Sequence, residues 1–238
     1  PYHVTLVQDL KEEDFPRRIQ FCNFMQHQLE LDNNFLFKVL FSDEARFGNN
    51  GVVNRHNCHY YSQNNPHWIR TAHFQNVYSI NVWAGIIADY VIGPYFFEGN
   101  LTGHRYRQFL ENDFPGLLEN VPLNLRQELW FQQDGAPPHY HRVVRDYLDE
   151  TFANKWIGRG SVNAWPPRSP DLTPLDFFLW GVVKEQVYQS PIRNCEDLKT
   201  RIRNACAAIT PETLARVRLS CLNRIEMCVA QEGRHFEH

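Results

Sequence analysis

Three aspartates in this sequence, Asp43, Asp134 and Asp176, stand where carboxylates could bind a metal ion or move a proton. Asp134 follows an apolar run at residues 129–131 that predicts a short buried strand. A helical pattern over residues 138–152 comes after it. Ligands of open α/β sheets bind at the carboxyl ends of strands, so we expect Asp134 to face a ligand. The alternative interpretation is a turn aspartate that caps the next helix.

Asp43 lies at the end of a stretch in which apolar residues alternate with others. This period of two predicts a strand over residues 35–43 whose apolar face is formed by Phe35, Phe37, Val39 and Phe41. Asp43 is the next position on that face, where a buried carboxylate is costly unless a positive charge or metal ion compensates. A strand-end aspartate that turns into solvent is the alternative.

Asp176 lies near the start of a third pattern. Thr173 suits the N-cap of a helix and Pro174 its first position, and a wide apolar stripe continues to Val187. Asp176 falls in the first turn, off that stripe. It could face the other two acids, or it could only complete a capping box and interact with the helix dipole.

The predicted order of elements can bring the three acids together. A helical arm (1–33) precedes the domain, and the expected elements are strands at 35–43, 52–61, 77–87 and 91–97, a helix from Thr102, the strand at 129–131, the helix at 138–152, a short strand near 162–165, and helices at 173–187, 195–208 and 211–231. This order predicts an α/β domain with a mixed sheet, antiparallel strands first, and helices on both faces. If the strands that carry Asp43 and Asp134 are neighbours, their carboxylates meet at one edge, and a helix can supply Asp176.

Such a cluster favours hard divalent cations. Three neighbouring carboxylates repel one another, so without cations at least one should keep its proton. Oxygen ligands suit Mg²⁺ or Mn²⁺. Two such ions can stabilise the entering and leaving oxygens of a phosphoryl displacement.

The composition of the chain excludes several classes of protein and of site. The chain of 238 residues is 43% hydrophobic, which excludes a disordered or fibrous protein and permits a full core. The six cysteines form no C-x-x-C pair, so neither a zinc site nor a disulfide framework is expected. A net charge of −3 gives no general sign of nucleic-acid binding, which would have to depend on local basic patches.

The three acids lie in strings that resemble the acidic motifs of Tc1/mariner transposases. These strings are FSDEARF (Phe41–Phe47), QQDGAPPH (Gln132–His139) and SPDLTPLD (Ser169–Asp176). The last is the most specific, because its third acid follows the first Asp of the string by five residues, which makes Asp171 a turn residue. The resemblance covers nearly the whole chain.

The resemblance implies an RNase H-like fold over residues 34–238 and a metal-dependent DNA transposase. Asp43, Asp134 and Asp176 would be the catalytic ligands of two Mg²⁺ or Mn²⁺ ions that activate water to cut a transposon end. The freed 3′-OH would then attack target DNA, which in this family is cut at TA dinucleotides. The implied partners are double-stranded DNA and a second copy of the protein, the implied location is the nucleus, and no membrane association is expected.

Two departures from the family pattern are visible. The family's N-terminal helix-turn-helix region is expected to be absent, since Pro1–Leu6 already resembles the linker that follows it. The 41 residues between Asp134 and Asp176 exceed the spacing of the commonest mariner subgroup, with the extra residues expected near 153–161.

Other residues are weaker candidates. DNA contacts are assigned to His139, Arg142, Lys155, Arg159 and Arg168, although each could be an ordinary surface or packed side chain. Glu44 is interpreted as a solvated neighbour of Asp43 in preference to a supporting group. Residues 64–68 resemble the loop through which mariner dimers clamp each other, and the tryptophans are assigned to the core.

Two rival functions remain open. The first is a host-adopted protein that keeps the transposase fold only to bind DNA or protein, although three intact acids count against it. The second is another RNase H-like nuclease, such as one that cuts RNA–DNA hybrids, which the SPDLTP string disfavours.

Overall fold

The computed structural model describes residues 8–49 and 78–236. The predicted strand at 52–61, the proposed clamp loop at 64–68 and the linker-like start of the chain lie outside these ranges. The elements in chain order are α1 (Asp14–Leu31), α2 (Phe35–Lys38), β1 (Val39–Gly48), β2 (Ser79–Ile87), β3 (Tyr90–Phe97), α3 (Gly103–Gln108), α4 (Phe114–Leu117), α5 (Leu123–Gln127), β4 (Trp130–Gln132), α6 (Arg142–Thr151), β5 (Trp156–Ile157), α7 (Trp180–Val187), α8 (Cys195–Ala207) and α9 (Pro211–Ala230). Widened helical turns, Phe109–Asp113 and Leu175–Leu179, lead directly into α4 and α7.

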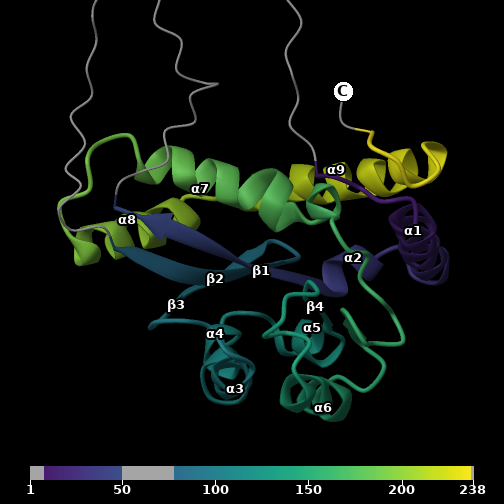
Figure 1. Cartoon of the computed structure of the whole chain (residues 1–238), viewed down its shortest axis with the longest axis horizontal. Coiled ribbons are helices and arrows are strands. Elements are labelled where there is room, and N and C mark those ends of the chain that lie inside the picture. The colour runs from purple at the N-terminus through teal and green to yellow at the C-terminus, as the bar shows by residue number, and fades with distance from the viewer. Residues whose placement is uncertain (1–7, 50–77, 237–238) are drawn as a thin grey trace, which may run out of the picture.

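The described strands form one mixed sheet in the order β3-β2-β1-β4-β5 (Figure 1). β1, β2 and β3 are antiparallel neighbours, whereas β4 and β5 run parallel to β1. The predicted α/β class, with antiparallel strands first, is therefore confirmed. β1 lies at the centre, so it contacts both the antiparallel and the parallel half.

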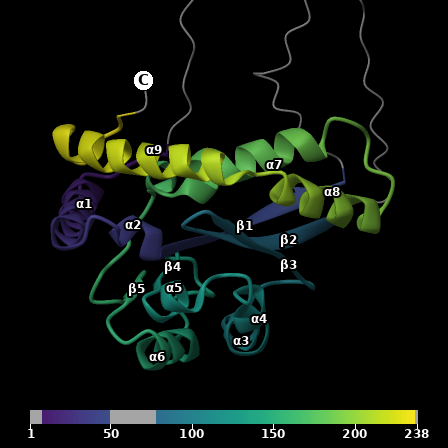
Figure 2. The ribbon, with the colours of Figure 1, turned by 180° about the vertical axis from the view of Figure 1, so that it is seen from behind.

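Helices cover both faces of the sheet, as predicted. Helices α7, α8 and α9 lie on one side and α3 to α6 on the other (Figures 1 and 2). Two hydrophobic clusters correspond to these faces: Phe41 and Phe47 of β1 belong to the first, and Leu40 to the second. Adjacent residues enter different clusters because side chains alternate across a strand. Asp43 therefore points to the α7 side and Glu44 to the α3 side.

Helix α1 is packed into the domain and does not extend from it as an arm. Its buried residues Phe21, Cys22 and Met25 belong to the same cluster as residues of α9. The turn after α9 fixes this contact, because a Cβ on Gly233 (φ +78°) would lie 2.4 Å from the carbonyl oxygen of Phe15. None of the helices in the described ranges combines the length and apolar character needed to cross a membrane.

Local patterns misplaced two strand boundaries. Residues 35–38 form the helical turn α2, because Asp32 and Asn34 provide the carbonyl oxygens that accept from the amides of Phe35 and Phe37. The strand predicted near 162–165 is reduced to one bridge between Ile157 and Asn163, and the true strand is β5. With only two residues, β5 is too short to show a periodic pattern.

The predicted helix at 138–152 was also too long. Residues 137–140 form a separate turn instead, in which the amide of Tyr140 donates to the carbonyl oxygen of Ala136 at 3.0 Å. Helix α6 begins at Arg142, after His141 at the N-cap, whose Nδ1 accepts from the amide of Val143 at 3.4 Å.

Candidate active site

The register of the parallel strands brings Asp43 and Asp134 to the same edge of the sheet. Phe41 of β1 is paired with Gln132 of β4, and each aspartate follows two residues later. A side-chain bond locks this register, because Ser42 Oγ donates to the Gln132 carbonyl at 2.6 Å. The prediction that these strands are neighbours is confirmed. The prediction that Asp43 ends its strand is wrong, because β1 continues beside β2 to Gly48, and only the pairing with β4 stops at Phe41.

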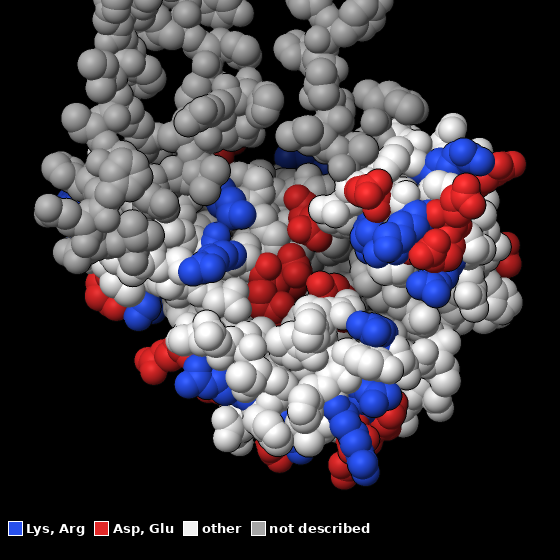
Figure 3. Space-filling model, viewed as in Figure 1, with Lys and Arg blue, Asp and Glu red and all other residues white. Residues whose placement is uncertain are grey.

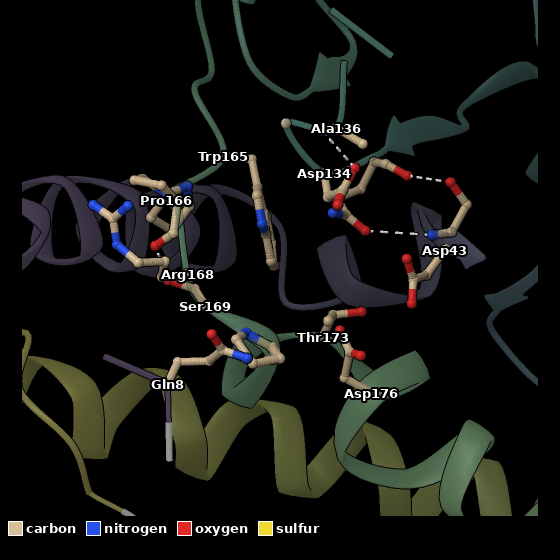
Figure 4. Close-up of a pocket in the computed structure, with 15 residues that line it drawn as sticks. Gln8, Asp43, Asp134, Ala136, Trp165, Pro166, Arg168, Ser169, Thr173 and Asp176 are labelled. Atoms are coloured by element: carbon tan, nitrogen blue, oxygen red, sulfur yellow. Dashed lines mark hydrogen bonds between the residues drawn. The ribbon is translucent and has the colours of Figure 1, made fainter. Parts of the chain in front are cut away.

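Asp176 reaches the same place from the widened turn before α7. Both Thr173 and Asp176 line a pocket of about 360 Å³ that also contains Asp43 and Asp134. Figure 4 shows the three carboxylates around this space, coming from three separate segments. Figure 3 shows acidic side chains on the floor of a hollow in this face, with Lys and Arg side chains around it. The bond from the Leu175 amide to Thr173 Oγ1 (3.3 Å) helps fix the start of this turn, as the N-cap prediction requires.

Asp43 is the acid of the three whose ionised form is least favoured by its surroundings. Burial and the neighbouring charges of Asp176 and Glu44 raise its pKa well above the usual value. The hydrogen bond that Trp180 Nε1–H donates to Asp43 Oδ2 at 2.8 Å only partly offsets this rise. Asp43 therefore tends to keep a proton when no cation is near, as expected for clustered carboxylates.

The other two acids differ from each other. Burial in the pocket wall and the charge of Asp134 raise the pKa of Asp176 to about 6, although over a third of the residue is accessible to water. Burial also raises the pKa of Asp134, but hydrogen bonding and charge from His139 outweigh this effect and lower it overall. Asp134 is thus the most readily ionised of the three carboxylates.

Within the described residues, no three His, Cys, Asp or Glu side chains already stand at the mutual spacing of a metal site. The three aspartates share a pocket but do not yet point at one common position. Their chemistry nevertheless fits a hard cation, because the donors are carboxylates and two of them have pKa values that a positive charge would lower.

Comparison with known proteins agrees with this arrangement. No family model matches the chain. The Tc3 transposase of Caenorhabditis elegans is 27% identical over 206 residues, which are 84% of this chain and 58% of that protein. The catalytic domain of Mos1 mariner transposase has the same fold, with a TM-score of 0.75 and 22% identity over 98% of this chain and 100% of that one. A second Mos1 structure, a paired-end complex with Mn, matches with a TM-score of 0.82 and 23% sequence identity over 100% of this chain and 68% of that one. The chain is therefore similar to the Tc1/mariner transposases, as its three acidic strings suggested.

The expected RNase H-like fold is therefore confirmed. The chain spans less than two thirds of the length of the Tc3 transposase, so its activity must be argued from its own residues. The three acids line one pocket, and their assignment as the catalytic residues stays a prediction.

His139 is buried, which does not fit the prediction that it contacts DNA. Its side chain is 2% exposed, and its ring nitrogens face Asp134 and Glu44. Burial lowers the pKa of His139, but the two carboxylates outweigh this and raise it to about 10. The interpretation of Glu44 as a solvated neighbour was wrong, because its side chain is only 12% exposed and contacts His139.

The four basic candidates for DNA contacts fall into two groups. Arg142, Lys155 and Arg159 are exposed, and Arg142 has only a loose contact with Asp146 at 3.5 Å. Arg168 also lines the pocket, but its Nε and Nη2 each donate to a carboxylate oxygen of Asp14 at 2.5 Å. Its charge is therefore already neutralised within the protein, and this weakens the case for a phosphate contact.

A buried arginine that the sequence did not reveal holds the third acidic motif. Arg18 of α1 is fully buried and donates to both carboxylate oxygens of Asp171 (2.7 and 2.5 Å) and to Ser169 Oγ (2.8 Å). Its Nε donates to the carbonyl of Gly233 at 2.8 Å. Asp171 is thus a turn residue, as predicted, with a buried ion pair in addition. No local pattern could have shown this, because about 150 residues separate the partners.

The tryptophan assignments hold for most of the described residues. Trp83, Trp156, Trp165 and Trp180 are buried in the core. Two of them also serve the pocket: Trp165 lines it, and Trp180 donates to Asp43.

Proposed function

We propose that this chain is the catalytic part of a transposase that cuts DNA at transposon ends and joins the freed ends to target DNA. The observation that carries the proposal is the shared pocket of Asp43, Asp134 and Asp176, which three distant segments supply. The parallel register of β1 and β4 makes this meeting a consequence of the fold. Fold similarity alone would not assign an activity.

The residues proposed to hold the metal ions are Asp43, Asp134 and Asp176. When bound, two Mg²⁺ or Mn²⁺ ions would supply the Lewis acidity that activates an attacking oxygen and stabilises a leaving oxygen. The raised pKa values of Asp43 and Asp176 support this assignment, because they partly reflect repulsion between neighbouring carboxylates that a bound cation would relieve. Mos1 paired-end complexes have been solved with Mn and with Mg.

The chain's own residues then set the geometry of the reaction. The hydrogen bonds between Ser42 and Gln132 hold the strands that carry Asp43 and Asp134 in register. Trp180 fixes Asp43 Oδ2, so the orientation of this carboxylate is set before substrate arrives. Such pre-organisation is how a protein lowers the barrier of phosphoryl transfer, in which most catalysis is positioning and charge stabilisation.

The proposed partners are double-stranded DNA and a second copy of the protein. Exposed Arg142, Lys155 and Arg159 lie close in sequence to Asp134 and are proposed to contact phosphates. The similar Mos1 structures include a paired-end complex with the left transposon end and a strand-transfer complex. These assemblies support the proposals that DNA and a second copy of the protein are partners. A DNA substrate in a eukaryotic host would place the protein in the nucleus.

Nicking of supercoiled plasmid DNA tests the proposed function. We expect nicking with Mg²⁺ or Mn²⁺ and none with EDTA, and the Asp134→Asn protein should nick at least about 10³-fold more slowly, because an amide is a poor ligand for these ions. Asp146→Asn removes an exposed carboxylate of α6 and is the matched control, with unchanged nicking. Nicking by Asp134→Asn at the wild-type rate would contradict the assignment, and binding of DNA without any cleavage would favour the host-adopted alternative.

A further inference from the structure

Two adjacent residues of β1, Asp43 and Glu44, point to opposite faces of the sheet. Asp43 lines the pocket directly, whereas Glu44 points to the α3 side and contacts His139. The distances from His139 Nε2 to the two carboxylate oxygens of Glu44 are 3.2 and 3.1 Å. His139 Nδ1 lies 2.6 Å from Asp134 Oδ1. One imidazole thus connects the strand that carries the first acid to the loop that carries the second.

This contact is enclosed by protein. The ring of Tyr106, which is fully buried, packs on His139 with 4.3 Å between ring centroids and 37° between their planes. Gln133 Nε2 donates to the backbone carbonyl of His139 at 3.3 Å. A neutral imidazole has only one N–H, so a ring that faces a carboxylate from each nitrogen is best satisfied when both nitrogens carry hydrogen. His139 is then a buried cation between two anions, a costly arrangement for a residue that only fills space.

The two oxygens of the Asp134 carboxylate have different surroundings. Oδ1 accepts from His139 Nδ1 at 2.6 Å and from the amide of Ala136 at 2.9 Å. Oδ2 accepts no hydrogen bond from any residue in the described ranges. The Asp134 side chain is 45% exposed and lines the pocket. The protein therefore occupies one oxygen and leaves the other for a pocket ligand.

We propose that His139 and Glu44 are positioning residues. They keep Oδ1 of Asp134 hydrogen-bonded within the protein, so that Oδ2 is the oxygen of this carboxylate that binds metal. This inference rests on the proposed function, because it assumes that Asp134 binds the ion. Glu44 acts only through His139, which it holds from the other face of the sheet. Groups that orient a metal ligand commonly contribute roughly 10- to 100-fold to metal affinity.

Two substitutions of His139 separate positioning from packing. In His139→Asn the amide nitrogen stands where Nδ1 stands, so the bond to Asp134 survives and the bond to Glu44 is lost. In His139→Gln the amide reaches toward Glu44, and Oδ1 of Asp134 loses its partner. We expect calorimetric titration with Mn²⁺ to give about 10- to 100-fold weaker binding for His139→Gln, and a loss of less than about 10-fold for His139→Asn.

A structural role alone would predict a different pattern, in which Mn²⁺ affinity follows the thermal stability of each variant. Asp149→Ala supplies the comparison, because it removes the acceptor of the hydrogen bond from Trp156 Nε1 (2.8 Å) beside β4 without touching the pocket. This control should lose stability and keep wild-type affinity. Equal Mn²⁺ affinity of His139→Gln and Asp149→Ala, at equal stability, would overturn the positioning role.

The part played by Glu44 is tested by a double-mutant cycle. Glu44→Leu leaves Nε2–H of His139 without its acceptor and should weaken Mn²⁺ binding, but add little in a protein that already carries His139→Gln. Additive effects would overturn the claim that Glu44 acts through His139. If wild-type protein binds no Mn²⁺, or Asp134→Asn binds it equally well, the proposed function itself fails. If wild-type protein binds Mn²⁺, Asp134→Asn does not, and the His139 variants bind with wild-type affinity, then only the positioning proposal fails.

Discussion

The indole of Trp180 is the only hydrogen-bond donor to Asp43 among the described residues, and it is not enough to keep that carboxylate ionised at its usual pKa. The site therefore holds unfavourable charge that the fold must tolerate. Proteins commonly accept such a loss of stability where function requires it. Removing one charge should then stabilise the protein while it destroys the activity.

We predict that Asp43→Asn raises the unfolding free energy of the metal-free protein at pH 7.5 by about 1 kcal/mol. A carboxyl whose pKa is higher in the folded state loses stability as pH rises from its unfolded value of 3.8 through the folded value. The gain should thus shrink toward pH 4. Urea unfolding in EDTA at several pH values measures it, and a variant less stable than wild type at pH 7.5 would contradict the account.

At the scale of elements, helix α1 holds the loop that delivers Asp176. Arg18 binds Asp171 through two parallel hydrogen bonds, and Asp14 binds Arg168 in the same way. Both pairs join α1 to the segment just before the third acid. Because buried pairs are costly to break, this junction should be the most sensitive part of the domain outside the hydrophobic core.

We predict that Arg18→Met lowers the unfolding free energy by about 3–5 kcal/mol, since it leaves Asp171 buried without a partner. Replacing both residues, as Arg18→Met with Asp171→Leu, should cost less than the single change. The exposed pair of Arg142 and Asp146 is the control, and Arg142→Gln should change stability by less than about 0.5 kcal/mol. If the double variant proved less stable than Arg18→Met, the ion-pair explanation would be wrong.

At the scale of the whole molecule, the sequence predicted the three acids, the antiparallel strands and the last two helices. Periodic patterns reveal elements that are long and bury one face, as α8 and α9 do. They fail for elements of two to four residues, such as α2 and β5, whose form is set by neighbouring backbone. They also cannot show contacts between distant residues, which is why the partners of His139 and Arg18 were missed.

Divalent cations should stabilise the whole domain, and more strongly at pH 8 than at pH 5. A ligand that binds only the folded state adds about 2.7 kcal/mol at a concentration of 100 times its Kd. Metal ligands must be deprotonated, and the pKa of Asp176 near 6 makes this harder in acid. Thermal unfolding with and without Mg²⁺ measures the effect, and Asp176→Asn should abolish most of it. An equal rise in Tm at both pH values would argue against binding by these carboxylates.

The central claim is that Asp43, Asp134 and Asp176 bind divalent cations together. Anomalous diffraction from Mn²⁺-soaked crystals tests it most directly. The account predicts two manganese peaks about 3.5–4 Å apart in this pocket, with carboxylate oxygens of all three aspartates about 2.2 Å from a peak. Peaks only elsewhere on the protein, or manganese held in the pocket by one aspartate while the other two stay apart, would contradict it.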